Sequence, residues 1–147
     1  FSTDDEDGDN PWDEIEELSD ELESDLDDIE GRLDDVEDMV EEAEDTLEDI
    51  TDDDDFDSER FNDKVTSFDS ELNELENEIA YMTGDIKGVY KKLTSSSKFI
   101  GRGDPEIAKE YLNQLRSDIE KLDVRVSDIE TRAEAVSESV NALQDAQ

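Results

Sequence analysis

Residues 61–93 read FNDKVTSFDSELNELENEIAYMTGDIKGVYKKL, and apolar residues recur in this stretch at alternating steps of four and three. We call such a stripe a seam. The members of this seam are Phe61, Val65, Phe68, Leu72, Leu75, Ile79, Met82, Ile86, Val89 and Leu93. Most positions between them are acidic or small and polar. A narrow stripe with this spacing is typical of a coiled coil, in which only two positions in seven face a neighbouring helix.

Two further seams have the same spacing. The seam before it contains Leu22, Leu26, Ile29, Leu33, Val36, Val40, Ala43, Leu47 and Ile50, with Ile15 and Leu18 joined through one four-residue stutter. The seam after it contains Ala108, Leu112, Leu115, Ile119, Leu122, Val126, Ile129, Ala133, Val136, Val140 and Leu143. We therefore predict helices at residues 12–50, 58–94 and 105–144 within a domain of residues 12–147. Residues 1–11 are expected to form a disordered acidic segment.

The breaks between the seams suggest an all-α fold, an elongated antiparallel three-helix coiled-coil bundle, because short turns join helices of similar length. The second break is rich in Ser and Gly and ends with Asp104 as helix N-cap and Pro105 at the first helical position. At the first break, Asp52–Asp55 favours a turn. An unbroken helix from Trp12 to Leu93 is the alternative, but it would bury two unpaired aspartates in the seam. A long parallel coiled-coil oligomer, such as a homo-oligomer, also remains open.

The charge is strongly acidic, with 50 acidic against 13 basic residues and a net charge of -37. Residues 1–55 carry 30 acids and one base, whereas residues 56–147 carry 20 acids and 12 bases. Self-repulsion on this scale opposes compact folding in dilute buffer, and concentrated salt screens it. We therefore expect a protein of a salt-in halophile, a haloarchaeon, located in the cytoplasm. Intrinsic disorder is the competing interpretation of such a composition, but uninterrupted seams argue against it.

Several function classes are excluded by residue type. The chain has no Cys and no His, so disulfides, zinc sites, thiol nucleophiles and imidazole bases are absent. It also lacks a glycine-rich phosphate loop and a nucleophile with an adjacent base, so we expect neither an enzyme nor a cofactor. Nucleic acid is not an expected partner, because phosphates are repelled by this surface. No segment is apolar for long enough to insert into a membrane.

The acidic segment at the start of the chain partly matches a calcium-binding loop. Asp5, Asp7, Asp9 and Glu14 fall at positions where such a loop places oxygen ligands, with Gly8 at its turn. The position of the first ligand holds Thr3 instead. A solvated acidic tail explains the same residues, so the sequence leaves both interpretations open.

One region is locally basic and carries exposed apolar residues. The candidate docking residues are Lys87, Tyr90, Lys91, Lys92, Lys98, Phe99, Ile100 and Arg102. Aromatic and Arg side chains are enriched among the anchors of protein interfaces, and basic charge on an acidic molecule steers an acidic partner to that place. The alternative is that Phe99 and Ile100 cap the end of the bundle and that the lysines are ordinary solvated charges.

Residues 72–101 resemble the coiled-coil segment of the archaellum accessory proteins of the C, D and E type. The resemblance lies in Val89, Tyr90, Leu93, Thr94, Phe99 and Ile100, which are similar to the apolar-aromatic ending of that segment, although its Asn-Pro pair is missing here. The resemblance implies a cytosolic scaffold that surrounds the archaellum motor, with motor or switch proteins as partners, and that links the motor to chemotaxis signalling.

We therefore expect a non-enzymatic structural and protein-interaction coiled coil. A stalk or spacer of a haloarchaeal envelope or virus protein, located on the cell surface or virion, is the alternative. Because the first residue is Phe, we expect a fragment or a processed product, and an anchor elsewhere in the full-length protein would favour the stalk.

Overall fold

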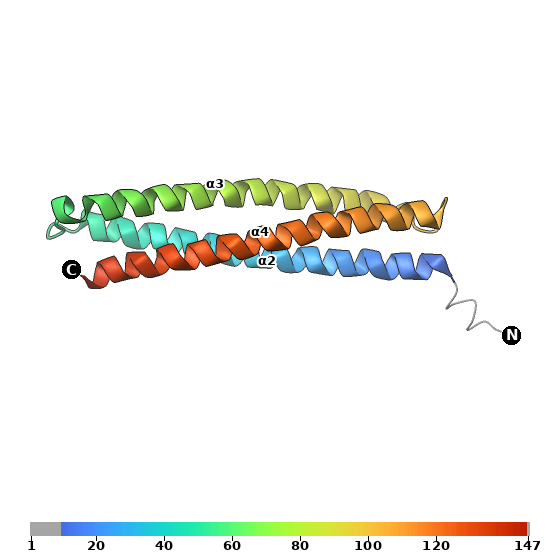
Figure 1. Ribbon diagram of the computed structural model, residues 1–147, viewed down its shortest axis with the longest axis horizontal. Coiled ribbons are helices and arrows are strands. Elements are labelled where there is room, and N and C mark those ends of the chain that lie inside the picture. The colour runs from blue at the N-terminus through green and yellow to red at the C-terminus, as the bar shows by residue number, and fades with distance from the viewer. Residues whose placement is uncertain (1–9, 147) are drawn as a thin grey trace. The chain divides into compact units, whose positions relative to one another are not determined.

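The computed structural model describes residues 10–146, and within that range it contains three α-helices and no strand (Figure 1). They are α2 (Pro11–Asp52), α3 (Ser58–Ser97) and α4 (Pro105–Asp145). The predicted all-α three-helix bundle is confirmed. Pro11, which the sequence assigned to a disordered segment, is instead the first residue of α2, and residues 1–9 lie outside the described residues.

The first break is a turn, so the alternative of an unbroken helix from Trp12 to Leu93 is wrong. The side chains of two aspartates hold this turn: Asp53 Oδ1 accepts a hydrogen bond from the Asp55 N–H at 3.0 Å, and Asp57 Oδ1 accepts one from the Arg60 N–H at 3.1 Å. Asp57 thereby caps the start of α3. In a continuous helix Asp54 and Asp57 would instead occupy seam positions and be buried without partners.

The other helix starts are capped in the same way. Asn10 Oδ1 accepts a hydrogen bond from the Trp12 N–H at 3.0 Å, with Pro11 at the first position of α2. Asp104 Oδ1 accepts one from the Glu106 N–H at 2.9 Å, which confirms the N-cap predicted for α4. The cap satisfies a backbone donor that has no partner within the helix.

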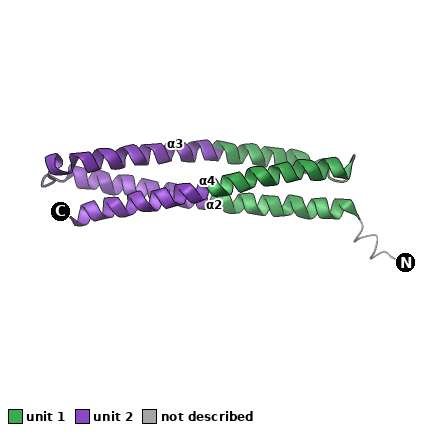
Figure 2. Ribbon diagram, viewed as in Figure 1, with its two compact units in different colours: residues 1–30, 84–124 green, residues 31–83, 125–147 purple. Residues whose placement is uncertain are grey.

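The described chain forms two compact units, and each contains a stretch of all three helices (Figure 2). Unit 1 consists of the described residues up to Glu30 together with Gly84–Val124. Unit 2 consists of Gly31–Thr83 and Arg125–Gln147. In unit 1 the start of α2 lies with the end of α3 and the start of α4, and in unit 2 the opposite ends of the helices lie together. Within each unit, α3 is therefore antiparallel to α2 and α4, as predicted.

The seams form the core of both units. All members of the first seam are buried, and the other two seams are buried except for Val65, Phe68 and Ala108, which are partly exposed. Phe68 borders a surface hollow beside Leu143, near the end of α4. Burial of one large apolar side chain contributes about 1.5–3 kcal/mol, so these narrow seams are the main favourable term in folding.

Ser19 is a core residue that the sequence did not predict. Its exposed fraction is 6%, and that of the neighbouring Leu18 is 8%. Ile15, Ser19 and Leu22 continue the alternation of four and three without interruption, so Ser19 occupies the regular heptad position and Leu18 is an additional buried neighbour. A search for apolar residues alone assigns a stutter here, because it passes over the serine.

Candidate functional site

The predicted docking residues lie in unit 1, at the end of α3 and in the turn that follows it. The four lysines and Arg102 are exposed, as is Phe99 with an exposed fraction of 60%. Tyr90 and Ile100 are partly buried. The structure therefore places six of the eight residues where a partner has access to them.

Tyr90 is occupied by a contact within unit 1. Its hydroxyl donates a short hydrogen bond to Asp27 Oδ1 of α2. Burial, followed by this hydrogen bond and the nearby charge of Glu30, raises the pKa of the Tyr90 hydroxyl above its ordinary value. Tyr90 thus joins α3 to α2, and its placement fits a structural role better than a docking role.

A surface groove lies where the end of α3 and the turn meet the start of α4. We call it the α3–α4 groove, and its volume is about 410 Å³. It is formed by Ser95 and Ser96 of α3, Phe99 and Arg102 of the turn, and Ile107 and Tyr111 of α4. Three of the five large apolar side chains that are exposed in the described chain are Phe99, Ile107 and Tyr111. The groove is therefore a concentrated apolar patch on an otherwise acidic molecule.

Ile107 and Tyr111 were missed by the sequence reasoning, although both border the groove. They lie one residue before the seam members Ala108 and Leu112, so the heptad pattern assigns them to the solvent-facing side. Two large apolar residues four positions apart and outside the seam are the signal that could have identified them.

The turn that shapes the groove depends on two glycines. Gly101 has φ of 90° and Gly103 has φ of 76°, a left-handed conformation that other residues adopt only with strain. The Phe99 N–H also donates to the Ser96 carbonyl at 3.0 Å, and the Arg102 N–H donates to the Phe99 carbonyl at 3.0 Å. These features hold Phe99 and Arg102 in a compact turn beside α4.

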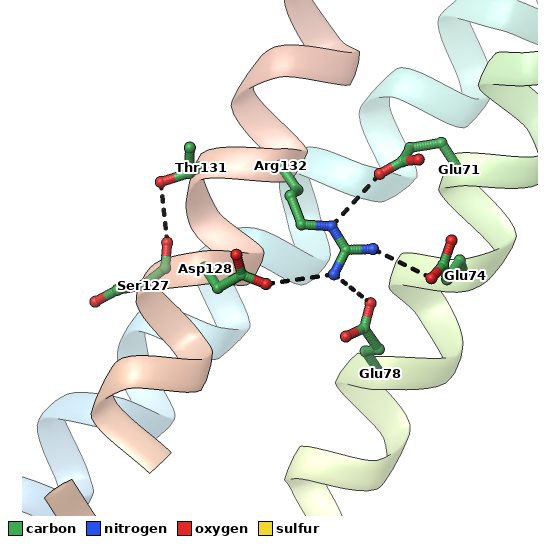
Figure 3. Close-up of polar contacts among 7 residues, drawn as sticks. All are labelled: Glu71, Glu74, Glu78, Ser127, Asp128, Thr131 and Arg132. Carbon is green, nitrogen blue, oxygen red and sulfur yellow. Dashed lines mark hydrogen bonds and ion pairs between the residues drawn. The ribbon is translucent and has the colours of Figure 1, made fainter. Parts of the chain in front are cut away.

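Unit 2 contains a second notable cluster, centred on Arg132 of α4 (Figure 3). Its guanidinium lies 2.6 Å from Glu78, 3.5 Å from Glu71 and 3.6 Å from Glu74, all on α3, and 3.4 Å from Asp128 on its own helix. Burial alone lowers the pKa of Arg132, but Glu78, Asp128 and Glu71 outweigh burial and raise it. The side chain remains charged and neutralises one acidic face of α3.

Two carboxyl groups face each other elsewhere in unit 2. Glu44 of α2 shares a side-chain hydrogen bond with Glu76 of α3. Burial, followed by this hydrogen bond and the charges of Glu76, Asp45 and Glu41, raises the pKa of Glu44 to about 7. A carboxyl–carboxyl hydrogen bond needs one proton, so this pair is sensitive to pH near neutrality.

Of the four predicted calcium ligands, only Glu14 lies in the described part of the chain. Asp5, Asp7 and Asp9 lie outside the described residues. Glu14 lies in the first turn of α2, where its carboxylate is 3.9 Å from Lys109 Nζ of α4. Among residues 10–146, no group of three or more acidic side chains is arranged to hold a metal ion.

The same range contains no helix that combines the length and the apolar character needed to span a bilayer. Comparison with known proteins gives no relative: no protein-family model matches the chain, and no curated protein and no solved structure is significantly similar to it.

Proposed function

We propose that the chain is a non-enzymatic scaffold that binds a protein partner through the end of unit 1 where α3 and α4 meet. The observation that carries this proposal is the distribution of apolar side chains. The seams are buried within the single chain, whereas Phe99, Ile107 and Tyr111 are exposed together in one groove. Exposed apolar patches rimmed by polar groups mark interaction surfaces.

The acidic remainder of the surface supports the same function. Carboxylates all over a molecule discourage nonspecific association with other acidic proteins and with nucleic acid. Binding is then directed to the one stretch, Ile86–Gly103, that contains five bases and no acid. In a salt-in halophile, where most proteins are acidic, such a basic stretch gives a scaffold a defined point of attachment.

The resemblance to the archaellum accessory proteins supports a more specific form of this proposal, a cytosolic scaffold at the archaellum motor. Its residues Phe99 and Arg102 would then lie at the surface that meets motor or switch proteins. Co-purification with motor proteins from a motile haloarchaeon tests this form. Recovery of the protein from the cell envelope or from virions would contradict it and favour a stalk.

The general scaffold proposal is tested by chemical cross-linking of the tagged chain in haloarchaeal extract at high KCl concentration, followed by mass spectrometry. We expect one or a few proteins to be captured in fixed ratio to the chain, at levels that added untagged chain reduces. Capture of no protein above the level seen with the tag alone would contradict the proposal.

A further inference from the structure

The shape of the α3–α4 groove suits a side chain of a peptide better than a small molecule. Phe99, Ile107 and Tyr111 provide its apolar surface, with exposed fractions of 60%, 67% and 37%. Small-molecule sites are concave and enclose most of the ligand, whereas this groove is open to solvent along the surface. Here the polar groups are two serine hydroxyls, Arg102 and Asp104, and Asp104 already caps α4. One large apolar anchor therefore fits the groove.

The charge beside the groove is positive and unneutralised. Lys91 and Lys92 precede Ser95 and Ser96 by one helical turn, so they share a side of α3 with the groove. Lys98 directly precedes Phe99. Within residues 10–146, no ion pair involves Lys91, Lys92, Lys98 or Arg102.

Several cations elsewhere in the two units have carboxylate partners, and of those that have no ion pair in the described range, Lys64 and Lys121 lie outside the groove. Arg32 lies 2.6 Å from Glu130, Lys109 lies 3.9 Å from Glu14, and Arg132 contacts four carboxylates. In a chain with 50 acids, cations that remain without a carboxylate partner are available to a partner from outside.

Charge complementarity therefore favours an acidic occupant that also carries an apolar anchor. A second copy of the chain offers acidic charge on α2, but every Leu, Ile and Val of α2 is buried, and its other large apolar residues, Trp12 and Met39, are partly buried, so α2 is a poor source of an anchor. Nucleic acid supplies negative charge but has no aliphatic side chain to insert, and its dense phosphate charge is repelled by the net charge of -37 more strongly than a short acidic segment is.

We infer that the α3–α4 groove binds an acidic amphipathic segment of a partner protein, which inserts a large apolar side chain between Phe99, Ile107 and Tyr111 and places carboxylates against Lys98 and Arg102. This inference rests on the proposed scaffold function and specifies the chemistry of its partner. Binding combines burial of the anchor with charge pairing that the chain itself does not satisfy.

The test measures fluorescence anisotropy of labelled synthetic peptides added to the full chain, at KCl concentrations from about 0.5 to 3 M. The main probe is an amphipathic peptide of about 18 residues, or five helical turns, with Leu and Phe on one face and Glu on the other. One control peptide replaces every Glu by Gln, because a lysine-rich peptide would bind the acidic surface nonspecifically, and a second replaces Leu and Phe by Ser. We expect the main probe to bind about tenfold or more tightly than either control.

Variants of the chain locate the binding site. Phe99→Ser and Ile107→Ser should each weaken binding of the acidic peptide about tenfold, since each removes apolar surface from the groove. Tyr81→Ser and Val124→Ser are matched controls, because those side chains are exposed by 73% and 69% and lie outside the groove. The double variant Lys98→Glu/Arg102→Glu should weaken binding of the acidic peptide, and most strongly at the lowest salt concentration. The double variant Lys64→Glu/Lys121→Glu changes the net charge equally but should leave binding nearly unchanged. Circular dichroism confirms that each variant remains helical.

Four results would overturn the inference. They are equal binding of the acidic and neutral peptides, equal effects of groove and control substitutions, self-association of the chain that Ile107→Ser abolishes, and binding to phosphatidylglycerol vesicles that Ile107→Ser abolishes. Failure here is distinguishable from failure of the scaffold function. If the wild-type chain captures a protein from extract and Phe99→Ser and Ile107→Ser leave that capture unchanged, the chain is still a scaffold, but the groove inference fails and the partner attaches elsewhere.

Discussion

The carboxyl pair of Glu44 and Glu76 makes the stability of unit 2 depend on pH. The pKa of Glu44 is about 7 in the folded chain against an ordinary value of 4.5, so between these pH values the folded state keeps a proton that the unfolded state releases. The contribution of Glu44 to stability is therefore fully present below pH 4.5 and is lost as the pH rises through about 7. We expect Glu44→Gln to remove this loss and to raise Tm above pH 7 by about 3 °C, a modest shift because the carboxyl is partly exposed.

Thermal melts followed by circular dichroism across this pH range measure the effect. Glu48→Gln is the control, because it removes one negative charge from an exposed position of the same helix. If Glu48→Gln flattened the pH dependence as strongly as Glu44→Gln, the general acidity of the chain and not this pair would be the cause.

Arg132 is the residue whose loss should cost most among the charged side chains. Without it, Glu71, Glu74 and Glu78 face α4 with no cation between them, so repulsion replaces attraction. We expect Arg132→Gln to lower the free energy of unfolding by about 1–2 kcal/mol, more than a surface ion pair contributes. Arg132→Lys should retain only part of this free energy, since a single ammonium group cannot contact several carboxylates at once as the planar guanidinium group does.

Urea denaturation at moderate and high KCl concentration measures these differences, which should shrink as salt screens the repulsion. Arg116→Gln serves as the control, because Arg116 has an exposed pair with Glu21 at 4.0 Å. Arg116→Gln should change the free energy of unfolding by no more than about 0.5 kcal/mol. Equal effects of Arg132→Gln and Arg116→Gln would show that the cluster acts as ordinary surface charge.

At the scale of elements, the same substitution should have opposite effects in a helix and in a turn. A Cβ added at Gly84 in α3 or at Gly101 in the turn would meet no atom within 4 Å, so only the backbone conformation differs. Gly84→Ala should stabilise the chain by about 0.5–1 kcal/mol through helix propensity. Gly101→Ala should destabilise it by about 1–2 kcal/mol, because its φ of 90° is left-handed.

Urea denaturation of the two variants checks this contrast, and Gly31→Ala in α2 gives a second helical comparison. Peptide binding by Gly101→Ala is informative as well, because the turn positions Phe99 and Arg102. Stabilisation by Gly101→Ala would mean that the turn between α3 and α4 does not keep this conformation in solution.

For the whole molecule, the net charge of -37 should make folding depend on salt. The screening length falls from about 10 Å at 0.1 M salt to about 3 Å at 1 M, so repulsion among neighbouring carboxylates is largely removed in concentrated KCl. We expect helix content and Tm, measured by circular dichroism, to rise steeply between these concentrations. Replacing Asp34, Asp35 and Asp38 by Asn should shift the increase in helix content and Tm to lower salt concentrations. Full helix content in dilute buffer would contradict the halophilic interpretation.

Much of the fold follows from spacing within each segment. The seam positions predicted the buried face of each helix, because a helix of 3.6 residues per turn brings residues three and four apart to one side. Asp104 was predicted as an N-cap, because short polar side chains bond the free N–H groups at helix starts, whereas the same role of Asp57 was not predicted. Ser19 could not be predicted in this way, since its burial depends on the heptad position and not on its own polarity.

The candidate site was predicted in part. Phe99 and Arg102 were found because they lie in the basic stretch, but Ile107 and Tyr111 belong to the next helix and join the groove only when the chain folds back. Tyr90 belongs to the same basic stretch, yet its hydroxyl is committed to Asp27, which lies 63 residues away in the sequence. Residue type and spacing indicate which side chains are suited to an interface, and folding decides which of them remain accessible.

The sequence by itself determined the three helices, their seams and the basic stretch Ile86–Gly103, because these properties depend on residues that are close together in the chain. Tertiary structure alone decided which cations are neutralised. Arg132 meets Glu78 only after α4 packs against α3, whereas Lys98 and Arg102 meet no carboxylate within the described residues. The physical reason is that an ion pair needs two charges within about 4 Å, a condition that heptad spacing does not specify for residues on different helices.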